Sequence, residues 1–356
     1  MSRIAMNLAR LAAFAAVALI SMTAATAQTP TAKAPAAVKG YAAPRTPDGK
    51  PDLQGIWTSA TITPLERPAE FANKEFLTPA EVAEYERVMR VKNNQDNRGG
   101  EKIEDLARAY NDIWWDRGTQ VIKTGRTSLV VDPPDGRIPA RTPEAQARLN
   151  ARREAQQQKC KTAACSEGTL SSADGPEDRS SGERCIAWGS SVPPMMPSAY
   201  NNNYQIVQSP GYVAIMIEMI HDVRIIPTDG TPHLPSRVRP WLGDSRGRWE
   251  GDTLVVETTN FNGRAAKDYD LSFKNASRNM RLVERFTRTD AETLTYRYTV
   301  EDPQTFTRPF TVELPLWRSS GPLYEYACHE GNYGMPGILS GARVIEKRRE
   351  LEKSKR

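Results

Sequence analysis

The sequence lacks the residue patterns that identify most metalloenzymes and nucleotide-binding enzymes. Histidine is scarce, with three residues in 356, and none of the three forms an H-E-x-x-H motif. None of the four cysteines forms a C-x-x-C pair, so the common zinc-binding motifs are excluded. No Gly-rich dinucleotide fingerprint occurs either, which argues against a Rossmann enzyme.

Long apolar runs are also absent beyond the first 27 residues. Arg3 and Arg10 precede the apolar run Leu11 to Ile20, and Ala25-Thr26-Ala27 forms an A-x-A cleavage site. We therefore predict a signal peptide at 1–27 and an exported chain, periplasmic or secreted, with no integral membrane segment after cleavage.

The mature chain has no strong excess of charge of one sign. The leader contains two arginines and no acid, so cleavage lowers the formal net charge of +5 by two. Six basic and three acidic residues in the tail 346–356 account for the remaining excess. A nucleic-acid binder would carry basic residues on a face of its fold, so we expect no nucleic-acid partner and a solvated charged tail at 344–356.

Four cysteines in an exported chain predict two disulfides, for which three pairings are possible. Cys160 and Cys165 are five residues apart in a polar loop, and we expect them to pair. This leaves Cys185 to pair with Cys328, in a bridge that would hold the backbone beside His329.

The chain divides into segments of different composition. Residues 28–45 predict a disordered arm, 46–158 a mixed helical segment packed on a β-domain, 159–184 a polar surface loop, and 185–343 an antiparallel β-domain. In the second segment, Thr78, Pro79 and Glu81 predict a helix start with a capping box. Helical spacing is also seen at 103–118 and, with a thin apolar face, at 142–158.

After Cys185 the hydrophobic period changes to two, and tight turn sequences separate the apolar stretches. We predict strands in YQIVQSP, YVAIMIEMIHDVRIIP, GRWEGDTLVVETTNF, MRLVERFTRTD, ETLTYRYTVED, FTRPFTVELPLW and LYEYACHE. The predicted fold is therefore mainly β, an antiparallel meander closing into a barrel-like or sandwich domain, with a smaller helical N-terminal segment.

The stretch around His221 contains the main candidate site residues. Strand alternation places His221 on one face and Glu218, Asp222 and Arg224 on the other, among apolar neighbours. That second face is either the lining of a ligand-binding barrel or an outer face covered by a helix. The alternation disfavours a pair of His221 with Asp222 or Glu218, so carboxylates of other strands, such as Glu257, Glu284 or Glu330, are the available partners.

The three histidines, His221, His233 and His329, support three interpretations. They could bind one divalent transition-metal ion, because three imidazoles and a water form a catalytic zinc site. They could act as acid–base catalysts, with Asp222 and Arg224 orienting the substrate. They could also be structural histidines whose ring nitrogens bond to backbone groups.

Other residues are candidates for ligand contacts or are set aside. Glu218, Trp115, Tyr204, Trp249 and Tyr333 are predicted to bind the ligand. A nucleophile elbow, which joins a strand to a helix, is not expected. The stretch 243–252 predicts a charged hairpin and does not suggest a phosphate-binding loop.

Several sequence blocks together resemble an uncharacterised family of exported bacterial proteins. They are RTPDGKPDLQGIW, YNDIWWDRG, RTSLVVDPPDGRIP, YNNNYQIVQSPGYVAIMIEMIHDVRIIP, WLGDSRGRWEGDTLVVETTNF and YEYACHEGNYGM, and they cover most of residues 45–343. The resemblance places the three histidines, Cys185 and Cys328 in recurring blocks, and it implies no activity.

Together these features predict an exported enzyme that performs hydrolysis, elimination or isomerisation on a small organic molecule in a histidine-centred pocket. The alternatives are a lipocalin-like binding protein without turnover and a cell-envelope interaction protein.

Overall fold

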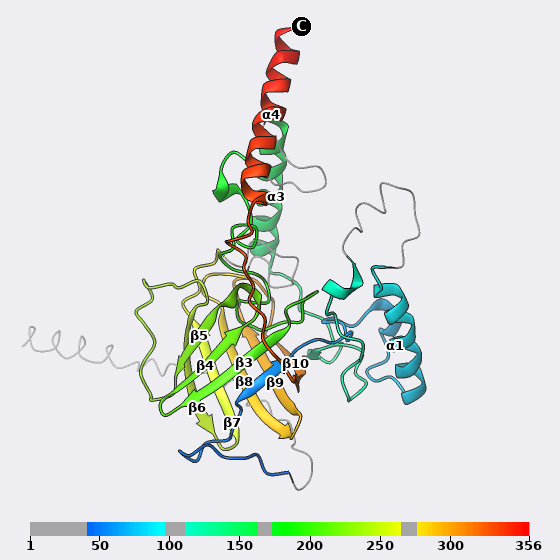
Figure 1. Cartoon of the computed structure of the whole chain (residues 1–356), viewed down its shortest axis with the longest axis vertical. Helices are drawn as coiled ribbons and strands as arrows, with labels where there is room; N and C mark the ends of the chain where they lie inside the picture. Colours follow the sequence, from blue (N-terminus) through cyan, green and yellow to red (C-terminus); the bar gives the residue numbers. More distant parts are fainter. Residues whose placement is uncertain (1–40, 97–110, 163–172, 265–275, 356) are drawn as a thin grey trace, which may run out of the picture. The chain divides into compact units, whose positions relative to one another are not determined.

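The computed structural model describes residues 41–96, 111–162, 173–264 and 276–355, and it is mainly antiparallel β-sheet (Figure 1). Nine strands form one path in the order β5-β4-β3-β1-β10-β9-β8-β7-β6, and β2 pairs with β10 beside this path. The strands are β1 (Gly55–Thr58), β2 (Val130–Asp132), β3 (Asn203–Ser209), β4 (Tyr212–Ile217), β5 (Val223–Pro227), β6 (Asp244–Glu250), β7 (Thr253–Thr259), β8 (Arg281–Asp290), β9 (Thr293–Glu301) and β10 (Phe310–Arg318).

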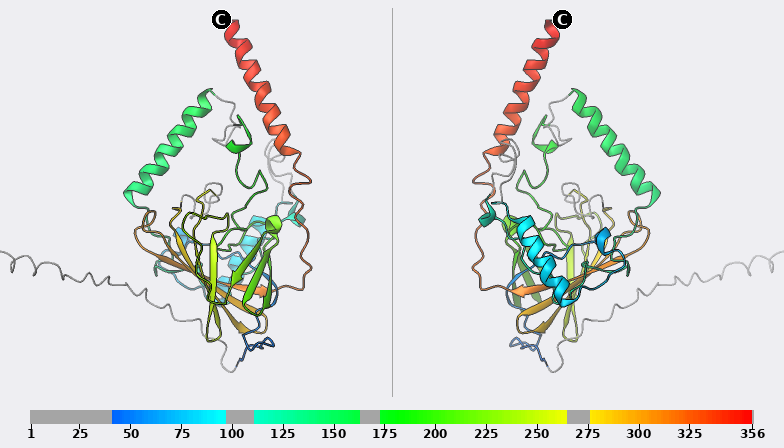
Figure 2. Two further views of the ribbon diagram at one scale, coloured as in Figure 1. Left: turned by 90° about the vertical axis from the view of Figure 1, so that its left-hand side faces the viewer. Right: turned by 90° about the vertical axis from the view of Figure 1, so that its right-hand side faces the viewer.

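The path closes on itself into a nearly complete barrel, as predicted, and the side views in Figure 2 show the strands curving around a common interior. An odd number of antiparallel strands leaves the two end strands, β5 and β6, running in the same direction. They meet through side chains: a Cβ on Gly247 would lie 2.8 Å from Thr228 Cγ2 and 3.0 Å from Ile226 Cγ2. Glycine at this position therefore allows the two end strands to approach closely.

The strand directions define two different ends of the barrel. Tight turns join β3 to β4, β6 to β7 and β8 to β9 at one end. The other end is where β3, β5, β6, β8 and β10 begin and where β1, β4, β7 and β9 finish. The connections 218–222 and 302–309 lie at this second end. We call it the histidine end, because the first of these connections contains His221.

The N-terminal segment contributes two strands to the sheet, of which the prediction missed β1. β1 lies between β3 and β10, and its Trp57 side chain is completely buried in the core. β2 pairs with the first half of β10. The strands also end at Arg318, so the predicted division into a helical segment at 46–158 and a β-domain at 185–343 does not match the limits of the sheet.

Three α-helices occur in the described residues. Helix α1 (Pro79–Asn93) begins with the predicted capping box, in which Thr78 and Glu81 bond to each other's backbone amides. Helix α3 (Pro143–Thr162) contains the predicted surface helix and extends into the predicted polar loop. Helix α4 (Gly334–Ser354) includes most of the predicted charged tail. Of the helical stretch predicted at 103–118, residues 103–110 lie outside those described, and residues 111–118 form a 3-10 turn at Asp112–Trp114 in place of the predicted α-helix.

Two of the strand predictions were wrong. The stretch 212–227 is not one strand, because β4 ends at Ile217 and β5 begins at Val223, with a 3-10 turn between them. Residues 324–329 have no strand pairing and form an irregular segment ending in a turn. Within the described parts of the chain, no helix combines the length and apolar character needed to cross a membrane.

Candidate functional site

The histidine-bearing segments meet the barrel at the same end. His221 follows the last residues of β4, and His233 lies on the connection that returns from β5 to Asp244, the first residue of β6. The segment 324–329 is attached there through Tyr324 N–H, which donates to Glu218, and through the Tyr326 carbonyl, which accepts from His221. Long connections at one end of a barrel are a common place for a functional site.

His233 contacts two carboxylates in this region, those of Asp244 and Glu257. Its Nδ1 lies 2.7 Å from Asp244 Oδ2, and the Asp244 side chain is 4% exposed. The same carboxylate accepts hydrogen bonds from Leu234 N–H at 2.9 Å and from Arg246 at 2.6 Å. An ionised carboxylate held by these donors fixes the Nδ1–H tautomer of the neutral ring and leaves the Nε2 lone pair available.

Glu257 lies on the other side of the His233 ring. Its Oε1 is 3.5 Å from Nε2, and Arg281 pairs with its second oxygen. Burial by itself would raise the pKa of Glu257, but the hydrogen bond and charge of Arg281 outweigh burial and hold that pKa below its usual value. Glu257 is therefore an anion at neutral pH and can stabilise a protonated His233 ring.

The turn between β4 and β5 has strained backbone geometry. Ile220 has φ +63° and His221 has φ +52°, the left-handed region that residues with a Cβ rarely adopt. His221 Nδ1 lies 3.0 Å from the Tyr326 carbonyl oxygen. Because a carbonyl can only accept, Nδ1 carries the proton and the Nε2 of this exposed ring is the basic atom in its neutral form.

Asp222 is partly buried in the same turn, and burial raises the pKa of its carboxyl. A hydrogen bond from Ser191 and the neighbouring His221 oppose this effect without cancelling it. Among the described residues, Asp222 Oδ2 is buried and has no hydrogen-bond partner. The folded protein therefore holds a proton on Asp222 to a higher pH than the unfolded chain does.

We expect Asp222→Asn to stabilise the protein at neutral pH. A raised folded-state pKa contributes stability below the ordinary pKa of aspartate, and this stability is lost as the pH rises through the raised value. Asparagine avoids that loss, so the gain should be on the order of 0.5–1 kcal/mol at pH 7 and should vanish at low pH. Urea unfolding of both proteins across pH checks this; a gain independent of pH would contradict it.

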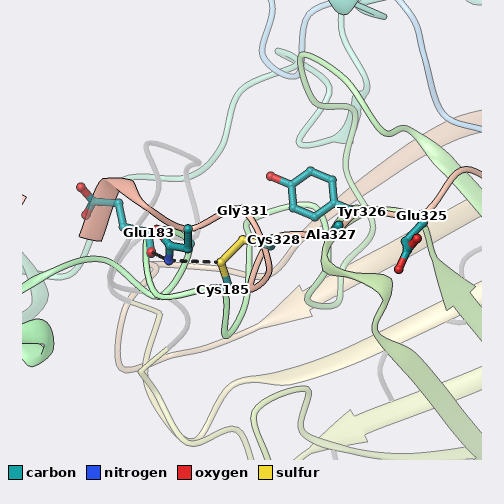
Figure 3. A pocket seen from close by; sticks show the side chains of 9 residues that line it. Glu183, Cys185, Glu325, Tyr326, Ala327, Cys328 and Gly331 are labelled. Carbon is teal, nitrogen blue, oxygen red and sulfur yellow. Dashed lines mark hydrogen bonds between the residues drawn. A yellow bond between two sulfur atoms is a disulfide. The ribbon is translucent and has the colours of Figure 1, made fainter. Parts of the chain in front are cut away.

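The predicted bridge between Cys185 and Cys328 is present, with a sequence separation of 143, and it borders a cavity of about 410 Å³. Figure 3 shows the sulfur pair with Glu183 on one side and Tyr326 on the other, and Glu325 beyond Tyr326; these residues line the cavity with Ala327 and Gly331. Asn332 Nδ2 donates to the Glu183 carbonyl at 2.9 Å and so fixes the turn after the bridge. The predicted Cys160–Cys165 pair includes a residue outside those described.

The three histidines do not form the predicted metal site. In the parts of the chain that the structure describes, which include all three, no group of three His, Cys, Asp or Glu side chains is placed to hold a metal ion. His329 is exposed in the turn after the bridge, and His221 and His233 each bond a different partner. The separation arises because residues 324–329 do not form the predicted strand.

Arg224 and Tyr204 were predicted to contact the ligand. Both side chains point into the barrel and are buried, so neither can reach a ligand that binds from solvent. Arg224 is 1% exposed and pairs with Glu284, with its two guanidinium nitrogens 3.0 Å and 2.6 Å from the carboxylate oxygens. The 3-10 turn shifts the strand alternation after Ile217, which brings Arg224 to the same side as the core residues. Tyr204 is fully buried and reaches the Met196 carbonyl.

The other predicted ligand contacts lie in separate surroundings. Glu218 is buried and accepts from Asn203 and from Tyr324 N–H, so it has a structural role at the histidine end. Trp115 packs against Tyr200 and Arg117. Trp249 packs partly against the core, and Tyr333 is 84% exposed just before α4.

The barrel interior is packed where side chains from β7 to β10 meet. Phe286, Tyr296, Tyr298, Phe310 and Leu314 are 0% exposed. A side chain with no solvent-accessible surface borders neither bulk solvent nor an internal cavity large enough to hold water. These residues therefore leave no lipocalin-like chamber in this part of the barrel.

Asp244 was not predicted as a site residue, although the sequence contains a pattern around it. Gly243–Gly247 has the spacing G-x-S-x-G. Ser245 nevertheless lies inside strand β6, 8% exposed, and contacts Thr258 and Arg224. No helix follows it, so the stretch is not a nucleophile elbow. The residue of this stretch that reaches His233 is Asp244, the first residue of β6.

Comparisons with known proteins identify no relative. No protein-family model matches the chain, no curated protein matches it, and no solved structure matches it. The resemblance of its sequence blocks to exported bacterial proteins therefore remains an interpretation, and the function has to be argued from the site.

Proposed function

We propose that the protein is an exported enzyme that acts on a small organic molecule at the histidine end of the barrel, with His233 as the acid–base residue. The observation that carries this proposal is the 2.7 Å contact between His233 Nδ1 and a buried, multiply hydrogen-bonded Asp244. The predicted leader, together with the Cys185–Cys328 bridge, supports export to the periplasm or beyond.

The arrangement suits removal of a proton by His233 Nε2. Asp244 orients the ring and stabilises the imidazolium that forms, as the carboxylate does in other His–carboxylate pairs. Glu257, 3.5 Å from Nε2, adds a second negative charge beside the protonated ring. The proton can come from water, which gives hydrolysis, or from a carbon next to a carbonyl, which gives elimination or isomerisation.

Replacing His233 by Asn should lower the catalytic efficiency by about 10²–10⁴-fold, the usual contribution of a general acid–base group. Asp244→Asn should have a similar effect, because it removes the anion that orients the ring. We would measure hydrolysis of p-nitrophenyl acetate and of a panel of lactones and phosphoesters. His329→Asn is the matched control, since its exposed ring has neither carboxylate partner.

Nitrogen-15 NMR of the imidazole rings provides a test that needs no known substrate. With three histidines in the chain, each can be assigned from its own Asn variant. We expect His233 to show the Nδ1–H tautomer and to lose it in Asp244→Asn. Unchanged tautomers in that variant, together with full activity of His233→Asn on every substrate that is turned over, would refute the proposal.

A further inference from the structure

Arg67 is a buried arginine without an acidic partner in the part of the chain that the structure describes. Arginine is buried at four of the described positions, 67, 179, 224 and 288. The second and third pair with glutamates, and Arg288 donates to two backbone carbonyl oxygens. Arg67 is 5% exposed, and its Nε and Nη2 atoms are buried with no hydrogen-bond partner among the described residues.

The backbone on which Arg67 stands is attached to the barrel wall. Residues 64–67 run beside residues 129–136, with backbone hydrogen bonds from Leu129 and Val130 to the 64–65 carbonyls, and from Arg67 N–H to the Gly136 carbonyl at 2.8 Å. The second of these stretches contains β2, which pairs with β10. The position of Arg67 is therefore set by the sheet.

The acidic side chains of these two stretches are bonded to other groups. Glu66 and Asp135 accept from backbone amides at 2.9 Å and 3.0 Å, and Asp132 pairs with Arg308 at 2.8 Å. An arginine side chain stays protonated in proteins, and a buried charge is costly unless it is paired. The fold thus holds at Arg67 a positive charge that calls for an anion.

The two unpartnered atoms of Arg67 form one edge of its guanidinium. Nε–H and one N–H of Nη2 point in the same direction, which is how arginine binds two oxygens of a carboxylate or phosphate at once. Gly136 borders this edge: a Cβ there would lie 3.0 Å from Arg67 Nε and would collide with Ser128 Oγ. Glycine at this position therefore keeps a side chain away from Nε.

We propose that Arg67 binds a small oxyanion through this edge, the carboxylate or phosphate group of a ligand that is not part of the chain. The site is separate from the His233–Asp244 pair, because β9, β8 and β7 lie between β10 and β6 in the sheet. It is therefore independent of the proposed catalytic role of His233.

Titration calorimetry with inorganic phosphate and with acetate tests the proposal on the full exported chain. We expect the wild type to bind about one equivalent of at least one of them. Arg67→Met keeps the length of the side chain without its charge and should abolish binding. Arg67→Lys keeps the charge without the two-point edge and should weaken binding at least about tenfold. Arg87→Met is the matched control, because Arg87 is exposed on α1, and should bind as the wild type does.

Thermal melts at constant ionic strength, with sodium chloride replaced by the probe anion, give a second readout. At about ten times its dissociation constant, the anion should raise the ratio of folded to unfolded wild type about tenfold. Phosphate also stabilises proteins by exclusion from their surface, and that effect should appear equally in Arg67→Met, without saturation. In chloride alone Arg67→Met should melt no lower than the wild type, because it removes an unpaired buried charge.

Three results would overturn the proposal. The first is a wild type that binds neither anion saturably, and the second is equal binding by Arg67→Met. The third is a lower melting temperature of Arg67→Met in chloride, which would show that the chain itself neutralises Arg67. If binding is found, the probe with the lower dissociation constant shows whether the ligand group is a phosphate or a carboxylate.

Discussion

Replacing Glu284 by Gln should lower the free energy of unfolding by about 3–5 kcal/mol, because it leaves a buried guanidinium without its counter-charge. Glu284 is 0% exposed, and its carboxylate accepts hydrogen bonds from both terminal nitrogens of Arg224. Burial alone would lower the pKa of Arg224, but the charge and hydrogen bonds of Glu284 outweigh it and keep the pKa above its usual value. The substitution therefore leaves a positive charge inside the barrel.

The rest of the network increases this effect. Tyr296 donates to Glu284 Oε1 at 2.7 Å, and Ser245 and Thr258 lie within hydrogen-bond distance of Arg224. Burial, followed by the Glu284 charge, raises the pKa of Tyr296 well above its usual value, so the phenol stays protonated as a donor. A neutral amide at position 284 cannot accept from all three donor atoms at once.

Urea unfolding at neutral pH measures the loss. The control is Glu84→Gln, which breaks the exposed pair with Arg87 and should leave the free energy of unfolding almost unchanged, because solvent screens that pair. The double variant Arg224→Met, Glu284→Leu removes both charges and should recover most of the stability. A loss below about 1 kcal/mol for Glu284→Gln would mean that the buried pair is not formed in solution.

Replacing Cys185 and Cys328 together by Ser should lower the free energy of unfolding by roughly 5 kcal/mol. The bridge closes a loop across a sequence separation of 143, and the chain-entropy cost of the unfolded state grows with the logarithm of that length. The expected fall in melting temperature is on the order of 10–20 °C. The variant also removes the covalent link between Cys185 and Cys328, which leaves the hydrogen bond from Asn332 to the Glu183 carbonyl to hold the two segments, so the cavity between them should widen.

Calorimetric melts of the oxidised wild type and of this double variant measure the effect. Replacing Cys160 and Cys165 by Ser is the matched control, since the short loop that they are predicted to close should contribute only about 2 kcal/mol in the same model. If the two double variants melt at the same temperature, the long-range bridge contributes no more than the predicted short one.

Sequence patterns predicted most of the barrel because most strands from β3 to β10 combine alternating apolar residues with a turn sequence; β6, with the sequence DSRGRWE, does not. The capping box at Thr78 was correct for a similar reason, since its three residues act on one another locally. β1 was missed because Gly55–Thr58 is too short to show a period. Its place in the sheet depends on residues of β3 and β10 that are far away in sequence.

The site was harder to predict because its pairs join distant segments. The alternation rule placed His221 on a regular strand, and two residues with positive φ at Ile220 and His221 interrupted that strand. Arg224 changed sides for the same reason, and the charge that suggested substrate contact became part of the core. His233 was proposed from its scarcity alone, whereas the residue that orients it, Asp244, was hidden in a predicted hairpin.

The position of β1 between β3 and β10 has a consequence for the synthesis of the protein. A ribosome releases β1 before any other strand, yet Trp57 pairs with Tyr204 on one side and Arg318 on the other. The first strand can pair with β3 once residues 203–209 have emerged, but its other edge must wait for the last strand. Barrel closure is consequently a late event that requires nearly the complete chain, and a nascent chain stopped before β10 would expose both β1 and the free edge of β9 to other proteins.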